Sequence, residues 1–238
     1  MACAGLAPYS VAMDRRPPDP FAADRARLLD EVEEDFRRTE KWTGRSHLSP
    51  RVLNALSRVP RHAFVPAELA VSAYANRPLG IGHGQTISQP YIVALMTELL
   101  DLEDADSVLE IGTGTGYQAA VLAAIAQTVY TVEFVPELAA RAEVLLTSLG
   151  YTNIRFRVGD GRNGWPEAAP FPAIMVTAAA ETIPDALIDQ LAPGGRMILP
   201  VGKVNGPQNL VLVRRDDSGR LSRDTVLAVA FVPSVGGG

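Results

Sequence analysis

The chain has 238 residues, 47% of them hydrophobic, and a formal net charge of −5. This length and hydrophobicity exclude a disordered chain and predict one α/β domain with additions. The negative net charge argues against nonspecific nucleic-acid binding, which needs a basic face. Cys3 is the only cysteine, which excludes intramolecular disulfides and cysteine-based zinc sites.

The sequence also indicates where the protein is located and which partners it has. The first residues lack the basic region of a signal peptide, and no segment approaches the roughly 18 apolar residues of a membrane helix. The three histidines lie far apart in sequence, so no metal site is expected. We therefore expect a cytoplasmic monomer without membrane or nucleic-acid partners.

The N-terminal third reads as a tail followed by helices. Residues 1–22 are proline-rich without periodicity, which predicts a mobile tail. Residues 24–38 form a charged helix whose apolar stripe packs against the domain, and residues 50–59 form a second helix that Ser49 caps. We expect a helical addition over residues 23–77 that forms one compact unit with a cofactor-binding domain over 78–238.

Residues 78–89 read PLGIGHGQTISQ, with three glycines and few large side chains, and predict a loop that leads into a helix over 90–100. Ser88 precedes Pro90 at the helix start, so it is a candidate N-cap. A helix N-terminus also suits a carboxylate substrate, and both roles are compatible. His83 is a candidate general base, although a solvated loop histidine is the commoner case.

The remaining chain alternates strands and helices. Strands are expected near 107–111, 129–133, 154–158, 173–177 and 196–200, and helices near 117–126, 136–149 and 184–191. Two late strands, 209–213 and 225–231, surround the turn at 216–219 and predict a hairpin with an antiparallel strand at one edge. The fold class is therefore a doubly wound, mostly parallel seven-stranded sheet with helical N-terminal additions.

The segment SVLEIGTGTG at 107–116 predicts a strand followed by a glycine turn that lets the backbone approach a ligand. Glu133 ends the next strand, where the ribose hydroxyls of a nucleotide lie. The spacing G-x-G-x-G differs from the dinucleotide pattern, and the carboxylate of Glu110 suits a cationic cofactor better than a pyrophosphate. These features favour S-adenosylmethionine over NAD, with a ligand-free glycine turn as the alternative.

The turn after the third strand of this domain, Val158 to Gly161, contains Asp160 between two glycines. Asp160 is a candidate acceptor for an adenine amino group, or else bonds its own backbone in the turn. Residues 177–180 are small, as expected where a substrate passes close to the backbone.

Several segments together resemble the protein-L-isoaspartate O-methyltransferase family. They read GHGQTISQPYIVALMTELL at 82–100, VLEIGTGTGYQAAVLA at 108–123, VGDGRNGWPEAAPF at 158–171 and VTAAAETIP at 176–184. The resemblance implies methyl transfer from S-adenosylmethionine to the carboxylate of L-isoaspartyl residues in damaged proteins and peptides. The ester then closes to a succinimide that reopens partly to normal aspartate.

The resemblance also assigns roles to residues. Ser88 matches the active-site serine, and Gln85, Thr86, Ile87 and Ser88 border the substrate. The matching cofactor contacts are Glu110, Gly112, Gly114, Thr115, Gly116, Glu133, Asp160 and Gly161. Pro172 and Asn76 depart from the family pattern, each where an acid is more usual.

Three other functions stay open at this stage. One is a tailoring enzyme that methylates ordinary aspartate in one dedicated peptide, since the cofactor site would be the same. Another is a non-catalytic adaptor with this fold, and the third is a nicotinamide dehydrogenase, which the glycine spacing disfavours.

Overall fold

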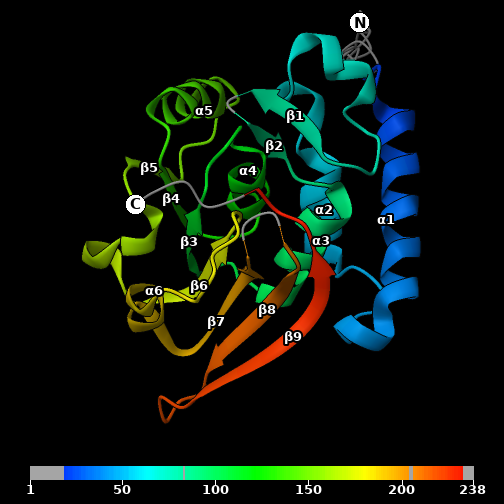
Figure 1. The fold of residues 1–238 in the computed structure, drawn as a ribbon. Coiled ribbons are helices and arrows are strands. Elements are labelled where there is room, and N and C mark those ends of the chain that lie inside the picture. The colour runs from blue at the N-terminus through cyan, green and yellow to red at the C-terminus, as the bar shows by residue number, and fades with distance from the viewer. Residues whose placement is uncertain (1–18, 83, 204–205, 233–238) are drawn as a thin grey trace, which may run out of the picture.

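The computed structural model describes residues 19–82, 84–203 and 206–232. Its centre is a seven-stranded sheet with the order β5-β4-β3-β6-β7-β8-β9 (Figure 1). The strands are β3 (Ser107–Ile111), β4 (Thr128–Glu133), β5 (Ile154–Val158), β6 (Phe171–Val176), β7 (Leu191–Gly202), β8 (Gln208–Arg215) and β9 (Leu221–Val229). The first five run parallel to one another, and β8 runs antiparallel to β7 and β9. The predicted doubly wound, mostly parallel sheet is confirmed.

Helices cover both faces of this sheet. They are α3 (Pro90–Leu100), α4 (Tyr117–Ala123), α5 (Pro136–Ser148) and α6 (Asp185–Asp189), with short 3-10 turns η3 (Gly161–Asn163) and η4 (Pro166–Ala168). Neighbouring residues of a strand point to opposite faces. Val108 of β3 joins the core with α3 and α4, whereas Leu109 packs in a second core with Leu187 of α6. Because both faces are covered, the strands are continuous apolar runs.

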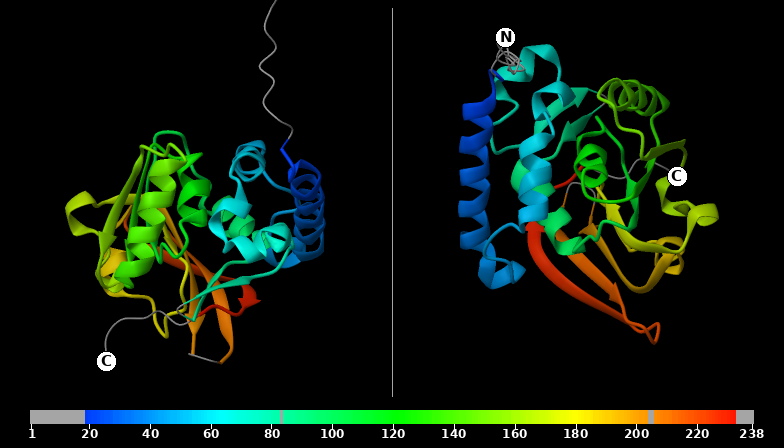
Figure 2. Two further views of the ribbon diagram at one scale, coloured as in Figure 1. Left: turned by 90° about the horizontal axis from the view of Figure 1, so that it is seen from above. Right: turned by 180° about the vertical axis from the view of Figure 1, so that it is seen from behind.

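The N-terminal helices lie beside α3, on one side of the sheet (Figure 2). They are α1 (Ala22–Thr43), α2 (Pro50–Arg58), η1 (Arg61–Phe64) and η2 (Ala67–Ser72). The apolar stripe of α1 packs on the domain as predicted, with the rings of Phe36 and Tyr91 5.6 Å apart. Ser49 caps α2 by accepting a hydrogen bond from the Val52 N–H at 3.4 Å, which confirms that prediction. Of the tail predicted over residues 1–22, residues 1–18 lie outside the described residues.

The segment predicted as a loop is a β-hairpin. Its strands, β1 (Leu79–Gly82) and β2 (Gln85–Ile87), pair antiparallel, with Leu79 opposite Ile87. The loop prediction was wrong because the glycines hid an alternation in which Leu79, Ile81 and Ile87 are buried. His83, the candidate base, lies between the strands and outside the described residues.

The C-terminal hairpin forms as predicted around the turn at 216–219, and it lies at one edge of the sheet with antiparallel pairing, as expected. The antiparallel strand β8 lies inside the sheet, and β9 forms the edge.

Pro172 precedes Ala173, the first residue of β6 that pairs with β3, so its missing N–H is not needed by that pairing. In the described part of the chain, no helix is both long and apolar enough to cross a membrane.

Candidate active site

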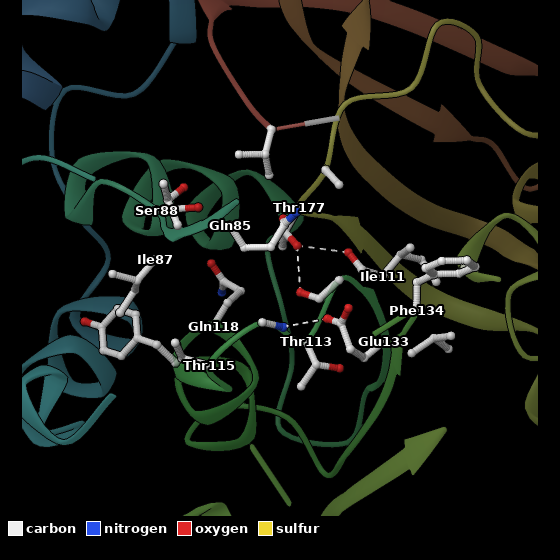
Figure 3. A pocket seen from close by; sticks show the side chains of 18 of the residues that line it. Gln85, Ile87, Ser88, Ile111, Thr113, Thr115, Gln118, Glu133, Phe134 and Thr177 are labelled. Carbon is white, nitrogen blue, oxygen red and sulfur yellow. Dashed lines mark hydrogen bonds between the residues drawn. The ribbon is translucent and has the colours of Figure 1, made fainter. Parts of the chain in front are cut away.

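A cavity lies at the carboxyl ends of β3, β4 and β6, where the connections from the central strands diverge to opposite sides of the sheet (Figure 3). Ligands of doubly wound sheets bind at this switch point. Most residues predicted for the site line the cavity: Gln85, Thr86, Ile87, Ser88, Gly112, Gly114, Thr115, Glu133 and Gly161. The structure therefore brings together segments that are far apart in sequence.

Thr177 holds the beginning of the glycine turn. Its hydroxyl contacts two carbonyl oxygens, that of Ile111 at 3.0 Å and that of Gly112 at 2.7 Å (Figure 3). A Cβ on Gly112 would lie 2.4 Å from the Thr177 hydroxyl oxygen. Gly112 is therefore required by close packing, as well as by its φ of +95°.

Two further predicted glycines act through packing. Gly116 is the N-cap residue of α4 and lies behind the cavity wall, where a Cβ would come within 2.7 Å of Leu146. Gly161 lines the cavity, and a Cβ there would lie 2.2 Å from a methyl group of Ile111. Gly114 differs, because only one atom lies within 4 Å of the Cβ position. The backbone at Gly114 is therefore open to a bound ligand.

Glu133 joins the end of β4 to the glycine turn. One carboxylate oxygen accepts from the Gly114 N–H at 2.8 Å (Figure 3), and the other accepts from the Val135 N–H at 3.0 Å. These two bonds hold the carboxylate at the cavity wall, although Glu133 is only 5% exposed. Glu133 therefore lies at the end of β4 and on the cavity wall as expected, and its contact with ribose hydroxyls stays a prediction.

Glu110 lies beneath the cavity and does not line it, among the residues described. The side chain is fully buried, and burial raises the pKa of its carboxyl group to about 8. One carboxyl oxygen accepts from Thr131 at 2.5 Å, and the other has no partner in the described structure. Thr131 in turn lies 2.6 Å from the hydroxyl of Thr113, which lines the cavity. Glu110 thus reaches the cavity wall through two threonines, because its position on β3 points into the core.

Asp160 is engaged by its own turn. It accepts from the backbone N–H of Arg162 at 3.0 Å and forms an ion pair with that guanidinium at 2.6 Å. The Arg162 side chain holds the pKa of Asp160 below its usual value. Of the two roles considered for Asp160, the structure shows the turn, and a contact with adenine stays a prediction that would use the remaining acceptor capacity of the carboxylate.

Ser88 follows β2 and is not the N-cap of α3. The N-cap residue is Gln89, without a side-chain cap, so the capping role predicted for Ser88 is wrong. No described residue forms a hydrogen bond with the Ser88 hydroxyl, whereas its carbonyl oxygen accepts from Arg61 at 2.8 Å. The Ser88 side chain is therefore left for the cavity.

A second groove meets the cavity at Ser88. It is lined by Asp35 and Thr39 of α1, the start of α3, and residues 227–232 at the end of β9. Thr86, Ser88, Thr177 and Val232 line both spaces. Two compartments therefore meet at this point.

Sequence reasoning missed several lining residues, among them Thr113, Gln118 and Phe134. Gln118 donates to Thr97 of α3 at 3.0 Å, and the Phe134 ring is 44% exposed beside Glu133. In the sequence, only their position could have indicated a place in the site, since each follows a predicted glycine or acid by one or two residues. The direction of the Gln118 side chain depends on its contact with α3, and that of Thr113 on its contact with Thr131 of β4, neither of which sequence shows.

A doubly wound sheet with an antiparallel strand β8, a G-x-G-x-G turn at its switch point and an acid after the next strand is the arrangement of the S-adenosylmethionine-dependent methyltransferases, whereas dinucleotide-binding folds carry G-x-G-x-x-G. The chain belongs to the protein-L-isoaspartate(D-aspartate) O-methyltransferase family, whose sequence profile matches residues 37–238.

Individual relatives agree with this assignment. The chain is 55% identical over 219 residues to protein-L-isoaspartate O-methyltransferase 2 of Syntrophobacter fumaroxidans, covering 92% of this chain and 89% of the relative. It is 52% identical to the Polaromonas sp. protein of the same name, and the alignment covers 88% of this chain and 99% of the relative. A solved protein-L-isoaspartate O-methyltransferase aligns with a TM-score of 0.76 at 29% identity, over 89% of this chain and 66% of that chain.

A further solved structure shares the fold. The putative protein-L-isoaspartate O-methyltransferase from Plasmodium falciparum, in complex with S-adenosyl-L-homocysteine, aligns with a TM-score of 0.71 at 22% identity, over 87% of this chain and 98% of that chain.

The cavity suits the cofactor of the family, S-adenosylmethionine. It offers an open backbone at Gly114, a fixed carboxylate at Glu133 and an exposed aromatic ring at Phe134. These are a close backbone approach, an acceptor for ribose hydroxyls and a stacking surface for a base.

Proposed function

We propose that this chain transfers the methyl group of S-adenosylmethionine to the free carboxylate of L-isoaspartyl residues in damaged proteins and peptides, which initiates their repair through a succinimide. The observation that carries the proposal is the meeting of the cavity and the groove at Ser88 and Thr86. A methyl group must pass between two ligands, so a transferase needs two compartments with a common wall.

The groove supplies what a carboxylate substrate needs. The N-cap residue Gln89 gives α3 no side-chain cap, and Asn76 accepts from only one N–H of the first turn, that of Tyr91 at 3.1 Å. The positive end of the helix dipole therefore still acts on the groove. The free hydroxyl of Ser88 lies beside it and is our candidate catalytic residue, with Gln85, Thr86 and Ile87 bordering the substrate. A carboxylate is already ionised at pH 7, so the reaction needs no general base.

The chain's main task is therefore alignment. Bound S-adenosylmethionine supplies an electrophilic methyl group on a sulfonium. We assign Gly112, Gly114, Thr115 and Glu133 to holding this cofactor, and Gly116 and Gly161 to shaping its wall. Glu110 acts from below through Thr131 and Thr113, and Asp160 borders the adenine end. Holding two reactants in line accounts for large rate effects without covalent catalysis.

Methyl transfer from labelled S-adenosylmethionine tests the proposal, using one peptide made in L-isoaspartyl and L-aspartyl forms. We expect base-labile label in the isoaspartyl form only. Label in the aspartyl form would instead indicate a tailoring enzyme. Label in neither form, despite cofactor binding, would overturn the repair function and favour an adaptor.

We further propose that the enzyme works as a monomer in the cytoplasm, without nucleic-acid or membrane partners. The net charge of −5 and the single cysteine support this. Light scattering of the purified chain tests the monomer, and a concentration-dependent dimer mass would contradict it.

A further inference from the structure

Arg61 of η1 is the largest fully buried side chain in the described structure, with 0% exposure. Its guanidinium donates through Nε to the Ala73 carbonyl and through Nη2 to the Ser88 carbonyl, both at 2.8 Å. It also lies over the ring of Tyr117, 4.8 Å from the centroid. The Arg61 guanidinium thus connects the end of η2 with Ser88, the proposed catalytic residue, and with Tyr117, which lines the cavity.

This burial is energetically unfavourable. In the described structure no carboxylate pairs with Arg61, and its Nη1 has no hydrogen-bond partner. Burial accordingly lowers the pKa of the Arg61 guanidinium. Removing a charge from water carries a large free-energy cost, and neutral carbonyl acceptors offset it less fully than a carboxylate partner would. The stability of the core alone does not account for an arginine here.

The bond to Ser88 also determines the direction of the next N–H. Among the described residues the only cis peptide bond is Ala169–Pro170, so the Ser88–Gln89 bond is trans. In a trans peptide the C=O and N–H point in opposite directions. The Gln89 N–H therefore points away from Arg61, and Gln89 is a residue that lines the substrate groove. No described group accepts a hydrogen bond from that N–H.

We propose that Arg61 is a positioning residue that holds the Ser88–Gln89 peptide so that the Gln89 N–H and the Ser88 hydroxyl both face the substrate carboxylate. The charge-assisted bond to the Ser88 carbonyl polarises the peptide and strengthens the N–H as a donor. Arg61 does not itself contact substrate. This inference rests on the proposed function, because it names the carboxylate as the acceptor.

Gln89→Pro is a direct test, because it removes the N–H donor and little else. Gln89 has φ −54° and ψ 134°, which proline adopts without strain. The matched control is Gln89→Ala, which loses the same side chain but keeps the N–H. We expect Gln89→Pro to lower kcat/KM for the isoaspartyl peptide about tenfold or more relative to Gln89→Ala, with the Kd of S-adenosylhomocysteine unchanged. Equal kcat/KM in the two variants would overturn the role of the N–H.

Arg61→Met and Arg61→Lys test the other end of the link, with Arg58→Met as the control at an exposed arginine of α2. We expect Arg61→Met to fold, to bind S-adenosylhomocysteine normally and to lose kcat/KM by roughly 10–100-fold, since small misplacements have effects of this size. Arg61→Lys should recover part of this loss. A folded Arg61→Met with unchanged kcat/KM would overturn the proposal.

Hydrogen exchange separates failure of this inference from failure of the proposed function. Without cofactor, residues 85–91 should exchange faster in Arg61→Met than in wild type or Arg58→Met. If wild type does not methylate the isoaspartyl peptide, the repair function fails, and this measurement still decides whether Arg61 holds the segment. Unchanged exchange would overturn the positioning role. If Arg61→Met does not fold, hydrogen exchange in Arg61→Lys and the comparison of kcat/KM between Gln89→Pro and Gln89→Ala test the positioning role instead.

Discussion

The two sides of the active site are built in opposite ways. On the cofactor side, glycines on either side of the open Gly114 are packed against neighbours, so that a Cβ on Gly112 or Gly161 would overlap Thr177 or Ile111. On the hairpin side, nothing lies within 4 Å of the Cβ positions of Gly80, Gly82 and Gly84. The cofactor is the same in every turnover, whereas damaged proteins differ in shape. A close-packed wall suits the invariant cofactor, and an open hairpin suits protein substrates of varied shape.

The first prediction concerns the floor of the cofactor side and carries the largest effect. The pKa of Glu110 is about 8 when folded, against an ordinary value of 4.5. Between these pH values the folded chain binds a proton that the unfolded chain has lost, so stability falls as the pH rises. From pH 5 to pH 8 we expect this group to lower the unfolding free energy by about 3.5 kcal/mol, since the slope is about 1.4 kcal/mol per pH unit and flattens near each pKa.

Urea unfolding of the cofactor-free protein at both pH values measures this effect, with Glu110→Gln as the control that cannot ionise. The difference in unfolding free energy between wild type and Glu110→Gln should widen toward pH 8, with the variant the more stable. A difference independent of pH would mean that the carboxyl group titrates normally and that the floor is less closed than the structure shows.

Gly161→Ala tests the packed wall itself. Its Cβ would meet Ile111 at 2.2 Å, and overpacking of this kind costs about 1–3 kcal/mol. Gly159→Ala is the matched control in the same turn, because nothing lies within 4 Å of that Cβ position. Thermal unfolding and calorimetric titration with S-adenosylhomocysteine should show weaker stability and binding for Gly161→Ala only. Equal effects in the two variants would remove the distinction between the two sides.

A pair of serines separates stability from catalysis on the open side. Ser49 is a true N-cap and also donates to Glu98 at 2.8 Å, so Ser49→Ala should cost about 1 kcal/mol of stability and leave kcat unchanged. Ser88→Ala should leave the unfolding free energy within about 0.5 kcal/mol and lower kcat about tenfold or more. Unfolding curves and initial rates check both. An unchanged kcat in Ser88→Ala would exclude its proposed role.

The smallest effect is expected at Asp160. Since Arg162 engages both carboxylate oxygens, Asp160→Ala should weaken binding of S-adenosylhomocysteine by only a few-fold, equivalent to a hydrogen bond of about 1 kcal/mol. Arg162→Ala is the control, because it frees the carboxylate and should leave affinity equal or improved. A loss of a hundredfold in Asp160→Ala would show that the ion pair opens to read the adenine.

Much of the architecture was predictable because it depends on local patterns. The five parallel strands, the covering helices and the Ser49 cap were placed within a few residues, since apolar runs and capping signals are local. The hairpin at 79–87 was missed because its three glycines obscure the alternation. Sequence spacing also assigned Ser88 a cap that Gln89 occupies.

The amino-acid order was enough to predict the glycine turn after β3, the acid after β4 and the small residues near Thr177, because chemistry at the ends of parallel strands follows directly from chain order. Side-chain direction was not predictable from chain order. Glu110 faces the core because it alternates with residues that face the opposite core. Arg61 contacts Ser88 because the fold places η1 beside the segment between β2 and α3, and the groove exists because α1 and the end of β9 line it together. Such contacts join residues separated by long stretches of chain, so only the folded packing decides them.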